Sequence, residues 1–221
     1  MRRLFVLVFG AAALLCISMS AVATNTIYYN GTTQSSYNDV GTGLYGGTLN
    51  GNATNFICDD YPDHIESGES WQASQANLEN LSGVTFPNPH GQTTLAAYTE
   101  VAWLAENLFY GLDNGGNNDP STVSWAIWTI LDDPPSGPSG TSALVTAAEN
   151  WYNGLSAGCK LTPVACGVVA DVNIWIPTSW SSSDGRPQEF LTATPEPLSL
   201  ILMGTFLTLA GGLLGRKRLL S

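Results

Sequence analysis

The chain has 221 residues and is acidic, with 18 Asp and Glu against seven Lys and Arg, for a net charge of −11. Charged residues make up only 11% of it, against about 25% in an average protein. This balance argues against a nucleic-acid-binding protein and against docking on anionic lipid, because both need basic patches.

The first 23 residues are typical of a secretory signal peptide. Arg2 and Arg3 precede an apolar run over 4–17, and Ala21 and Ala23 form a small-x-small site. Signal peptidase cuts at sites of this kind. We therefore expect export by the general secretory route, with cleavage after Ala23.

The last residues, 194–221, contain a Pro-Glu-Pro box, an uncharged apolar run at 198–215 and a basic end at 216–218. The apolar run has the minimum length for a helix that crosses a hydrocarbon core of about 30 Å. It predicts a single C-terminal transmembrane helix, with the basic end cytoplasmic and the preceding residues outside. The box consists of Pro195, Glu196 and Pro197, and the basic end of Arg216, Lys217 and Arg218.

These three parts, in this order, resemble the PEP-CTERM sorting signal of bacteria. The resemblance implies that the tail is a substrate of exosortase, a membrane cysteine enzyme that cuts near the box. It also implies anchoring in the inner membrane at first, then a place at the cell surface or outside the cell. The family is associated with extracellular polysaccharide and biofilm. The alternative is an ordinary membrane anchor in which the box is a coincidence.

Residues 24–193 have the size of one exported domain. Only Lys160 and Arg186 are basic in this span, against seventeen acidic residues. Three cysteines remain after removal of the signal peptide. The short spacing of Cys159 and Cys166 allows them to close a small loop as a disulfide, which would leave Cys58 as a free thiol.

The pattern of the exported domain predicts an α+β fold, with short strands at both ends and about three helices between them. Alternation and turn residues predict strands at 26–29, 44–49, 55–58, 168–176 and 188–192. Helical spacing and cap residues predict helices at 93–110, 120–131 and 142–153, and a shorter helix at 74–81.

Two motifs in this domain, Phe56-Ile57-Cys58-Asp59-Asp60 and Trp125-Ala126-Ile127-Trp128, resemble those of the thioester domains of bacterial surface adhesins. In that family the cysteine of the first motif joins a glutamine side chain two residues before the Ala-Ile-Trp. That position is Ser124 here. Serine has no carboxamide and cannot form the acyl half of a thioester. The resemblance therefore implies the fold of the family without its chemistry.

Cys58 then has two interpretations. It is either a nucleophile that uses another acyl partner or a small buried side chain of an inherited fold.

Other polar groups also have two interpretations each. The segment 113–119 is rich in oxygen ligands for calcium, but it lacks the pattern of a known calcium loop and reads as a polar turn. Asp59, Asp60, Asp63 and Glu66 are either a catalytic carboxylate pair or a solvated acidic loop. His64 and His90 have no partner at metal-ligand spacing. Trp175 and Trp180 could form a surface for sugars.

The sequence thus predicts an exported bacterial surface or matrix protein with a structural or adhesive role, no enzymatic activity and no cofactor or metal. Its expected partners are signal peptidase and exosortase during export, the membrane through the C-terminal helix, and an extracellular polysaccharide or surface partner. A covalent adhesin that uses Cys58 and a secreted glycan hydrolase are the alternatives.

Overall fold

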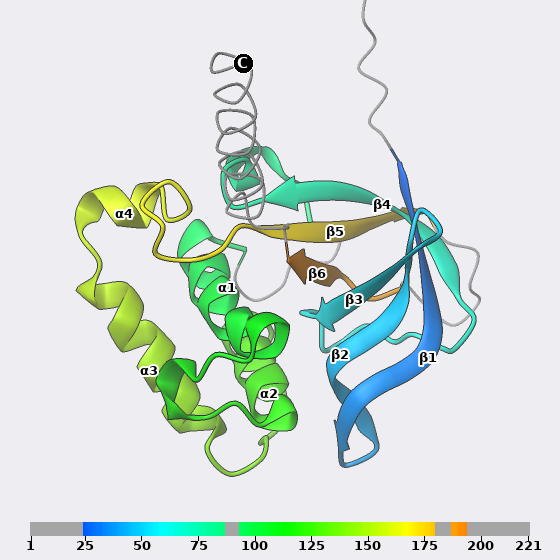
Figure 1. Cartoon of the computed structure of the whole chain (residues 1–221), viewed down its shortest axis with the longest axis horizontal. Helices are drawn as coiled ribbons and strands as arrows, with labels where there is room; N and C mark the ends of the chain where they lie inside the picture. Colours follow the sequence, from blue (N-terminus) through cyan, green and yellow to red (C-terminus); the bar gives the residue numbers. More distant parts are fainter. Residues whose placement is uncertain (1–23, 87–92, 180–186, 194–221) are drawn as a thin grey trace, which may run out of the picture.

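The computed structural model describes residues 24–86, 93–179 and 187–193. Six antiparallel strands form a closed barrel in the order β1-β2-β3-β6-β5-β4, and the helices lie together on one side of it (Figure 1). The strands are β1 Asn25–Tyr37, β2 Val40–Leu49, β3 Asn52–Cys58, β4 Ser70–Asn77, β5 Val172–Ser179 and β6 Phe190–Ala193. The helices are α1 Leu95–Tyr110, α2 Pro120–Leu131, α3 Thr141–Gly154 and α4 Ala157–Leu161, with 3₁₀ turns at Leu81–Gly83 and Asn114–Gly116.

The expected α+β fold, with short strands at both ends of the domain and about three helices between them, is wrong, because six antiparallel strands close one barrel. The shortest strand, β6, pairs with β3 on one side and with β5 on the other. The segment 74–81 is not a helix, since its first four residues belong to β4. Trp71 and Ala73 alternate with more exposed neighbours along this strand. That period of two outweighs the helix-favouring Ala and Gln residues of the segment.

Two tight hairpins connect the first three strands. Asn38 and Asp39 link β1 to β2, and Asn50 and Gly51 link β2 to β3, all four with positive φ. Two-residue turns of this kind match the right-handed twist of antiparallel strands. They set the register of the β1–β2–β3 part of the barrel.

Aromatic rings fill the interior of the barrel around Phe190. The ring of Phe190 lies 5.2 Å from Phe56, 5.6 Å from Tyr45 and 5.7 Å from Trp71, between centroids. Phe190 itself is fully buried. Large aromatic side chains bury the most apolar area per residue, so this cluster is the centre of the barrel core.

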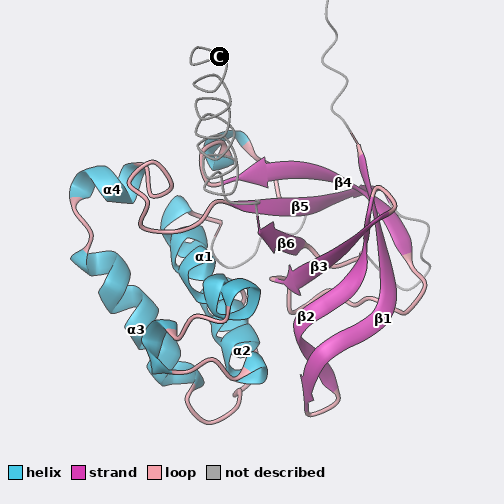
Figure 2. Ribbon diagram, in the orientation of Figure 1, coloured by secondary structure: helices cyan, strands magenta, loops and turns pink. Residues whose placement is uncertain are grey.

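Helices α1 and α2 confirm the predictions from helical spacing and caps. Gly111 ends α1 in the left-handed conformation, with φ of 66°. Asp119 caps α2 by accepting a hydrogen bond from the Thr122 backbone, and Pro120 occupies the first turn. The middle helix α2 buries ten of its twelve residues because it lies between the barrel and the other helices (Figure 2).

No helix in the described ranges is long and apolar enough to span a bilayer. The signal peptide, the Pro-Glu-Pro box and the transmembrane helix expected at 198–215 lie outside the described residues.

Candidate functional site

The structure brings together the two sequence motifs that resemble those of thioester domains. Cys58 is the last residue of β3, and Trp128 lies in the middle of α2. The indole Nε1 of Trp128 donates a hydrogen bond of 2.9 Å to the Cys58 carbonyl oxygen. The ring of Tyr61, just after the first motif, lies 5.4 Å from Trp128 and 5.7 Å from Trp125. The motifs are therefore neighbours in space, although 70 residues separate Cys58 from Trp128.

The thiol of Cys58 is buried and hydrogen-bonded. The residue is 1% exposed, and its Sγ donates to the Asp60 carbonyl oxygen at 3.3 Å. Burial raises the pKa of the Cys58 thiol well above its usual range, and the carboxylates of Asp60 and Asp59 raise it further. A thiol in this state holds its proton at neutral pH and is a poor nucleophile.

The hydroxyl of Ser124 is also used inside the fold. Its Oγ accepts a hydrogen bond of 2.8 Å from the backbone N–H of Gly43 in β2. One turn earlier, the hydroxyl of Ser121 lies 2.9 Å from that of Thr42. Ser121, Ser124 and Trp128 share one face of α2. We call this face, with Thr42, Gly43 and Cys58 opposite it, the α2 seam.

The α2 seam requires a glycine at position 43. Its φ is +77°, and a Cβ built on it would lie 2.9 Å from the Cβ of Pro120 at the start of α2. A glycine inside a strand often marks such a close approach. The glycine-rich sequence of β2 was thus the available signal for the contact, although it did not identify the partner helix.

Of the four acidic residues predicted to form a catalytic pair or a solvated loop, Asp59 and Asp60 are buried, Asp63 is half-buried and Glu66 is exposed. Asp59 and Asp60 are 0% and 1% exposed. Nearby, the Oδ2 of Asp132 accepts from the Tyr61 backbone at 2.9 Å. Glycosidase carboxylates must face a cleft that admits the sugar, so the burial of Asp59 and Asp60 does not favour the hydrolase interpretation.

A buried pair that the sequence analysis missed lies in the same region. The hydroxyl of Tyr98 donates to the Oε1 of Glu189 at 2.6 Å. Burial and the Glu189 carboxylate raise the pKa of Tyr98 well above its usual range. No periodic pattern could reveal this pair, because α1 and the segment before β6 are far apart in the sequence.

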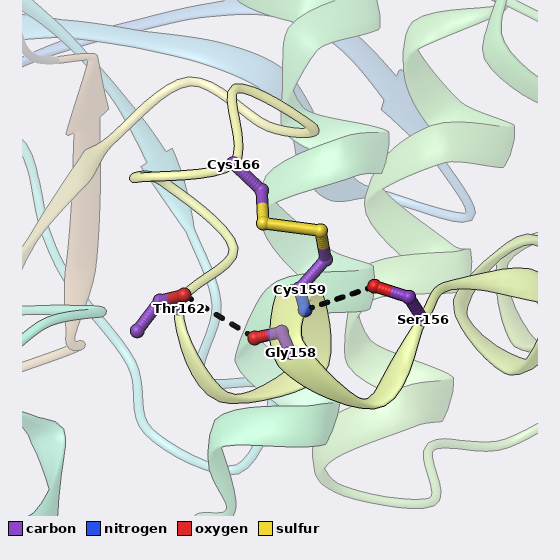
Figure 3. The surroundings of a disulfide bond; sticks show 5 residues. All are labelled: Ser156, Gly158, Cys159, Thr162 and Cys166. Atoms are coloured by element: carbon purple, nitrogen blue, oxygen red, sulfur yellow. Dashed lines mark hydrogen bonds between the residues drawn. A yellow bond between two sulfur atoms is a disulfide. The ribbon is translucent and has the colours of Figure 1, made fainter.

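Cys159 and Cys166 are joined by a disulfide between α4 and the following loop (Figure 3). Ser156 caps this short helix by accepting from the Cys159 backbone at 3.3 Å. Cys58 is a free cysteine, and it is buried. The disulfide and the free thiol lie in different environments, one at an exposed edge and one inside the α2 seam.

The oxygen-rich loop at 113–119 is tied to α1 by its own side chains. Asn107 in α1 accepts from the Asn114 backbone and donates to the carbonyl oxygens of Asn114 and Asn117. Asn114 in turn donates to the Trp103 carbonyl oxygen and to Glu106. This network supports the polar-turn interpretation of the loop. Across the described ranges, no three His, Cys, Asp or Glu side chains converge as a metal site.

Trp175 belongs to the barrel and not to a sugar-binding surface. It is 3% exposed, and its Nε1 donates to the Thr192 hydroxyl at 2.9 Å. His64 lies exposed on the loop after β3. Trp180 and His90 lie outside the described residues.

Comparison with known proteins leaves the family open. No family model matches the chain, and no curated protein matches it. The chain is similar to the solved N-terminal domain of the Streptococcus pyogenes pilus tip adhesin Cpa, at 16% identity and a TM-score of 0.39. The match covers 78% of this chain and 94% of that one. A similarity this distant identifies neither the family nor the function.

Proposed function

We propose that this chain is an exported bacterial cell-surface or matrix protein, with an adhesive or structural role and no catalytic activity. The α2 seam carries the proposal. Cys58 and Ser124 occupy the two positions where a thioester would form, and each uses its reactive group in a hydrogen bond within the fold. The site therefore supports cohesion between α2 and the barrel and not covalent attachment.

Two features of the chain support export. The N-terminal sequence matches a signal peptide with a cleavage site at Ala23. The Cys159–Cys166 disulfide suits an oxidising compartment. Signal peptidase and, through the Pro-Glu-Pro box, exosortase are the partners we propose for export.

The intact mass of the protein recovered from producing cells tests this function. We expect the mass of the processed sequence with one disulfide. We also expect one thiol that reacts with a thiol reagent only after unfolding, because Cys58 is buried. A mass lower by one ammonia, or a methylamine adduct, would instead identify a covalent adhesin.

The variant Ser124→Gln tests the same question, because it places at position 124 the glutamine that thioester domains have there. We expect no loss of ammonia in this variant, since residue 124 faces the Gly43 backbone and the Cys58 thiol is bonded to Asp60. Loss of ammonia in Ser124→Gln would show that only the glutamine is missing from a working thioester site.

A further inference from the structure

A cavity of about 450 Å³ lies beside the α2 seam, between the β1–β2 hairpin and the loop after β3. This volume falls within the range of roughly 300–1,000 Å³ that is usual for small-molecule sites. Its walls include Tyr29, Tyr45, Tyr61, Trp128, His64 and Gln188. Apart from Trp128, these side chains lie outside the two thioester-like motifs, so the cavity requires its own explanation.

Aromatic rings form the apolar part of the wall. The rings of Tyr29 and Tyr45 lie 5.8 Å apart, and those of Tyr61 and Trp128 lie 5.4 Å apart. Tyr61 is the more accessible of the four, because it is half-buried whereas the other three are buried. Of the four, the ring of Tyr61 therefore offers an apolar face to the C–H groups of a flat or cyclic ligand, and the other three pack behind it.

Gln188 supplies a hydrogen-bond acceptor that the described residues do not use. The residue is 8% exposed, and its Nε2 donates to the Asp63 carbonyl oxygen at 2.7 Å. Its Oε1 is buried and has no hydrogen-bond partner within the part of the chain that the structure describes. Nearly all buried polar groups in native proteins are paired. This unused acceptor lies just behind the wall of the cavity, and a ligand that brings a donor would satisfy it.

The loop that contains Asp63 lies against Gln188. Gln188 is bonded to the loop backbone, and Tyr61, His64 and Ile65 of the same loop line the cavity. Because Oε1 is closed to solvent, a ligand hydroxyl reaches it only when this loop moves outward, and the binding proposed below requires that movement. The exposed His64 side chain at the rim offers a second polar contact.

The charges of the described residues around the cavity disfavour anionic ligands. Among the residues that the structure describes, its walls contain no Lys or Arg, and Asp39, exposed in the β1–β2 turn, is a carboxylate on the rim. An anion would be repelled by this carboxylate and by the acidic chain.

We propose that this cavity binds a neutral saccharide unit, with one ring face against the aromatic wall and a hydroxyl donated to Gln188. The assignment rests on the proposed non-catalytic surface function, for which it names the ligand class. Gln188 is then a binding residue, and Tyr61 is the stacking surface.

Titration of the protein recovered from producing cells tests the proposal. The probes are neutral oligosaccharides (maltotetraose, cellotetraose and chitotetraose), with dextran sulfate and butylammonium chloride as charged controls. We expect at least one neutral oligosaccharide to bind and change the tryptophan fluorescence, because Trp128 lines the cavity. Failure of all neutral probes, or binding of a charged control alone, would overturn the proposal.

Gln188→Leu removes the acceptor, and Gln75→Leu makes the same chemical change at an exposed position in β4. We expect Gln188→Leu to weaken saccharide binding at least tenfold and Gln75→Leu to leave it within twofold. His64→Ala changes only an exposed side chain, so it provides a second test if Gln188→Leu fails to fold, with an expected loss of two- to fivefold. Equal binding in all these variants would place the sugar elsewhere.

The saccharide assignment and the proposed function fail in different ways. Cleavage of a bound oligosaccharide, seen as shorter products by chromatography, would overturn the non-catalytic function and leave the cavity assignment in place. An intact mass lower by one ammonia would indicate a thioester. It would overturn the proposal of non-covalent attachment and leave the cavity assignment in place. Absence of saccharide binding, with a plain intact mass, would overturn only the saccharide assignment.

Discussion

The two cysteine-containing regions of this molecule differ in what stabilises them. In the α2 seam, Cys58 is buried beneath a helix that itself buries ten of its twelve residues. The disulfide region, α4 with the loop to Cys166, contains no buried residue within its helix. A disulfide links the region where few side chains are buried, whereas the Cys58 thiol is held by dense packing and by its hydrogen bond to the Asp60 carbonyl oxygen. The comparison teaches that burial, more than spacing, decides what a cysteine does here.

The largest expected effect comes from the seam itself. Trp128→Ala removes a fully buried indole and its hydrogen bond to the Cys58 carbonyl oxygen. We expect a loss of about 3–5 kcal/mol in the free energy of unfolding, measured by urea denaturation with circular dichroism. The control is Trp151→Ala in α3, where the indole is half-buried and stacked on Trp103 at 5.1 Å. Equal losses of unfolding free energy in the two variants would contradict the conclusion that the α2 seam is packed more densely than the outer face of α3.

Removal of the disulfide should lower the free energy of unfolding by less, and its effect should be confined to α4 and the following loop. Replacing both Cys159 and Cys166 by Ala frees a short loop, which costs about 2–3 kcal/mol on the loop-entropy account. Hydrogen exchange should increase in α4 and in the loop that follows it, while amides of α2 keep their protection. Faster exchange throughout α2 would show that the two regions unfold as one unit.

Ser124→Ala probes a single hydrogen bond of the seam. It leaves the buried N–H of Gly43 without its partner, and we expect a cost of about 1–2 kcal/mol. Ser142→Ala, at an exposed position in α3, is the matched control and should change the thermal midpoint little. If the two variants have the same thermal midpoint, the Ser124 hydroxyl does not stabilise the contact between α2 and the barrel.

The smallest effect concerns the contact between α1 and α3. Burial, together with the neighbouring Glu149, raises the pKa of Glu100 from 4.5 to about 7. The folded protein therefore holds this proton more tightly than the unfolded chain, so stability decreases as pH rises from about 4.5 to about 7.

Glu100→Gln should flatten that decrease. Since Glu100 is only half-buried, we expect a gain below about 1 kcal/mol at pH 8 after allowing for solvent screening. Thermal midpoints measured from pH 4 to pH 8 provide the check, with the exposed Glu66→Gln as control. An unchanged slope in Glu100→Gln would mean that the α1–α3 contact does not depend on this proton.

The accuracy of the sequence predictions varied with the range of the interactions involved. The start of α2 was predictable because Asp119 and Pro120 are a local cap. The strand β4 was not, because its Ala and Gln residues favour a helix in isolation and only pairing with β1 and β5 makes it a strand. The sequence shows directly that Ser124 replaces the thioester glutamine. It does not show that this serine bonds to the Gly43 backbone.

By itself, the sequence determined the acidic balance that argues against nucleic acid, the caps of α1 and α2, and the loss of the glutamine at position 124. Only the tertiary structure decided that the strands close a barrel and that Asp59 and Asp60 are buried. It also decided that Ser124 bonds to Gly43, 81 residues away. The reason is physical: caps and turns depend on neighbours in the chain, whereas burial and barrel closure depend on contacts that no local pattern contains.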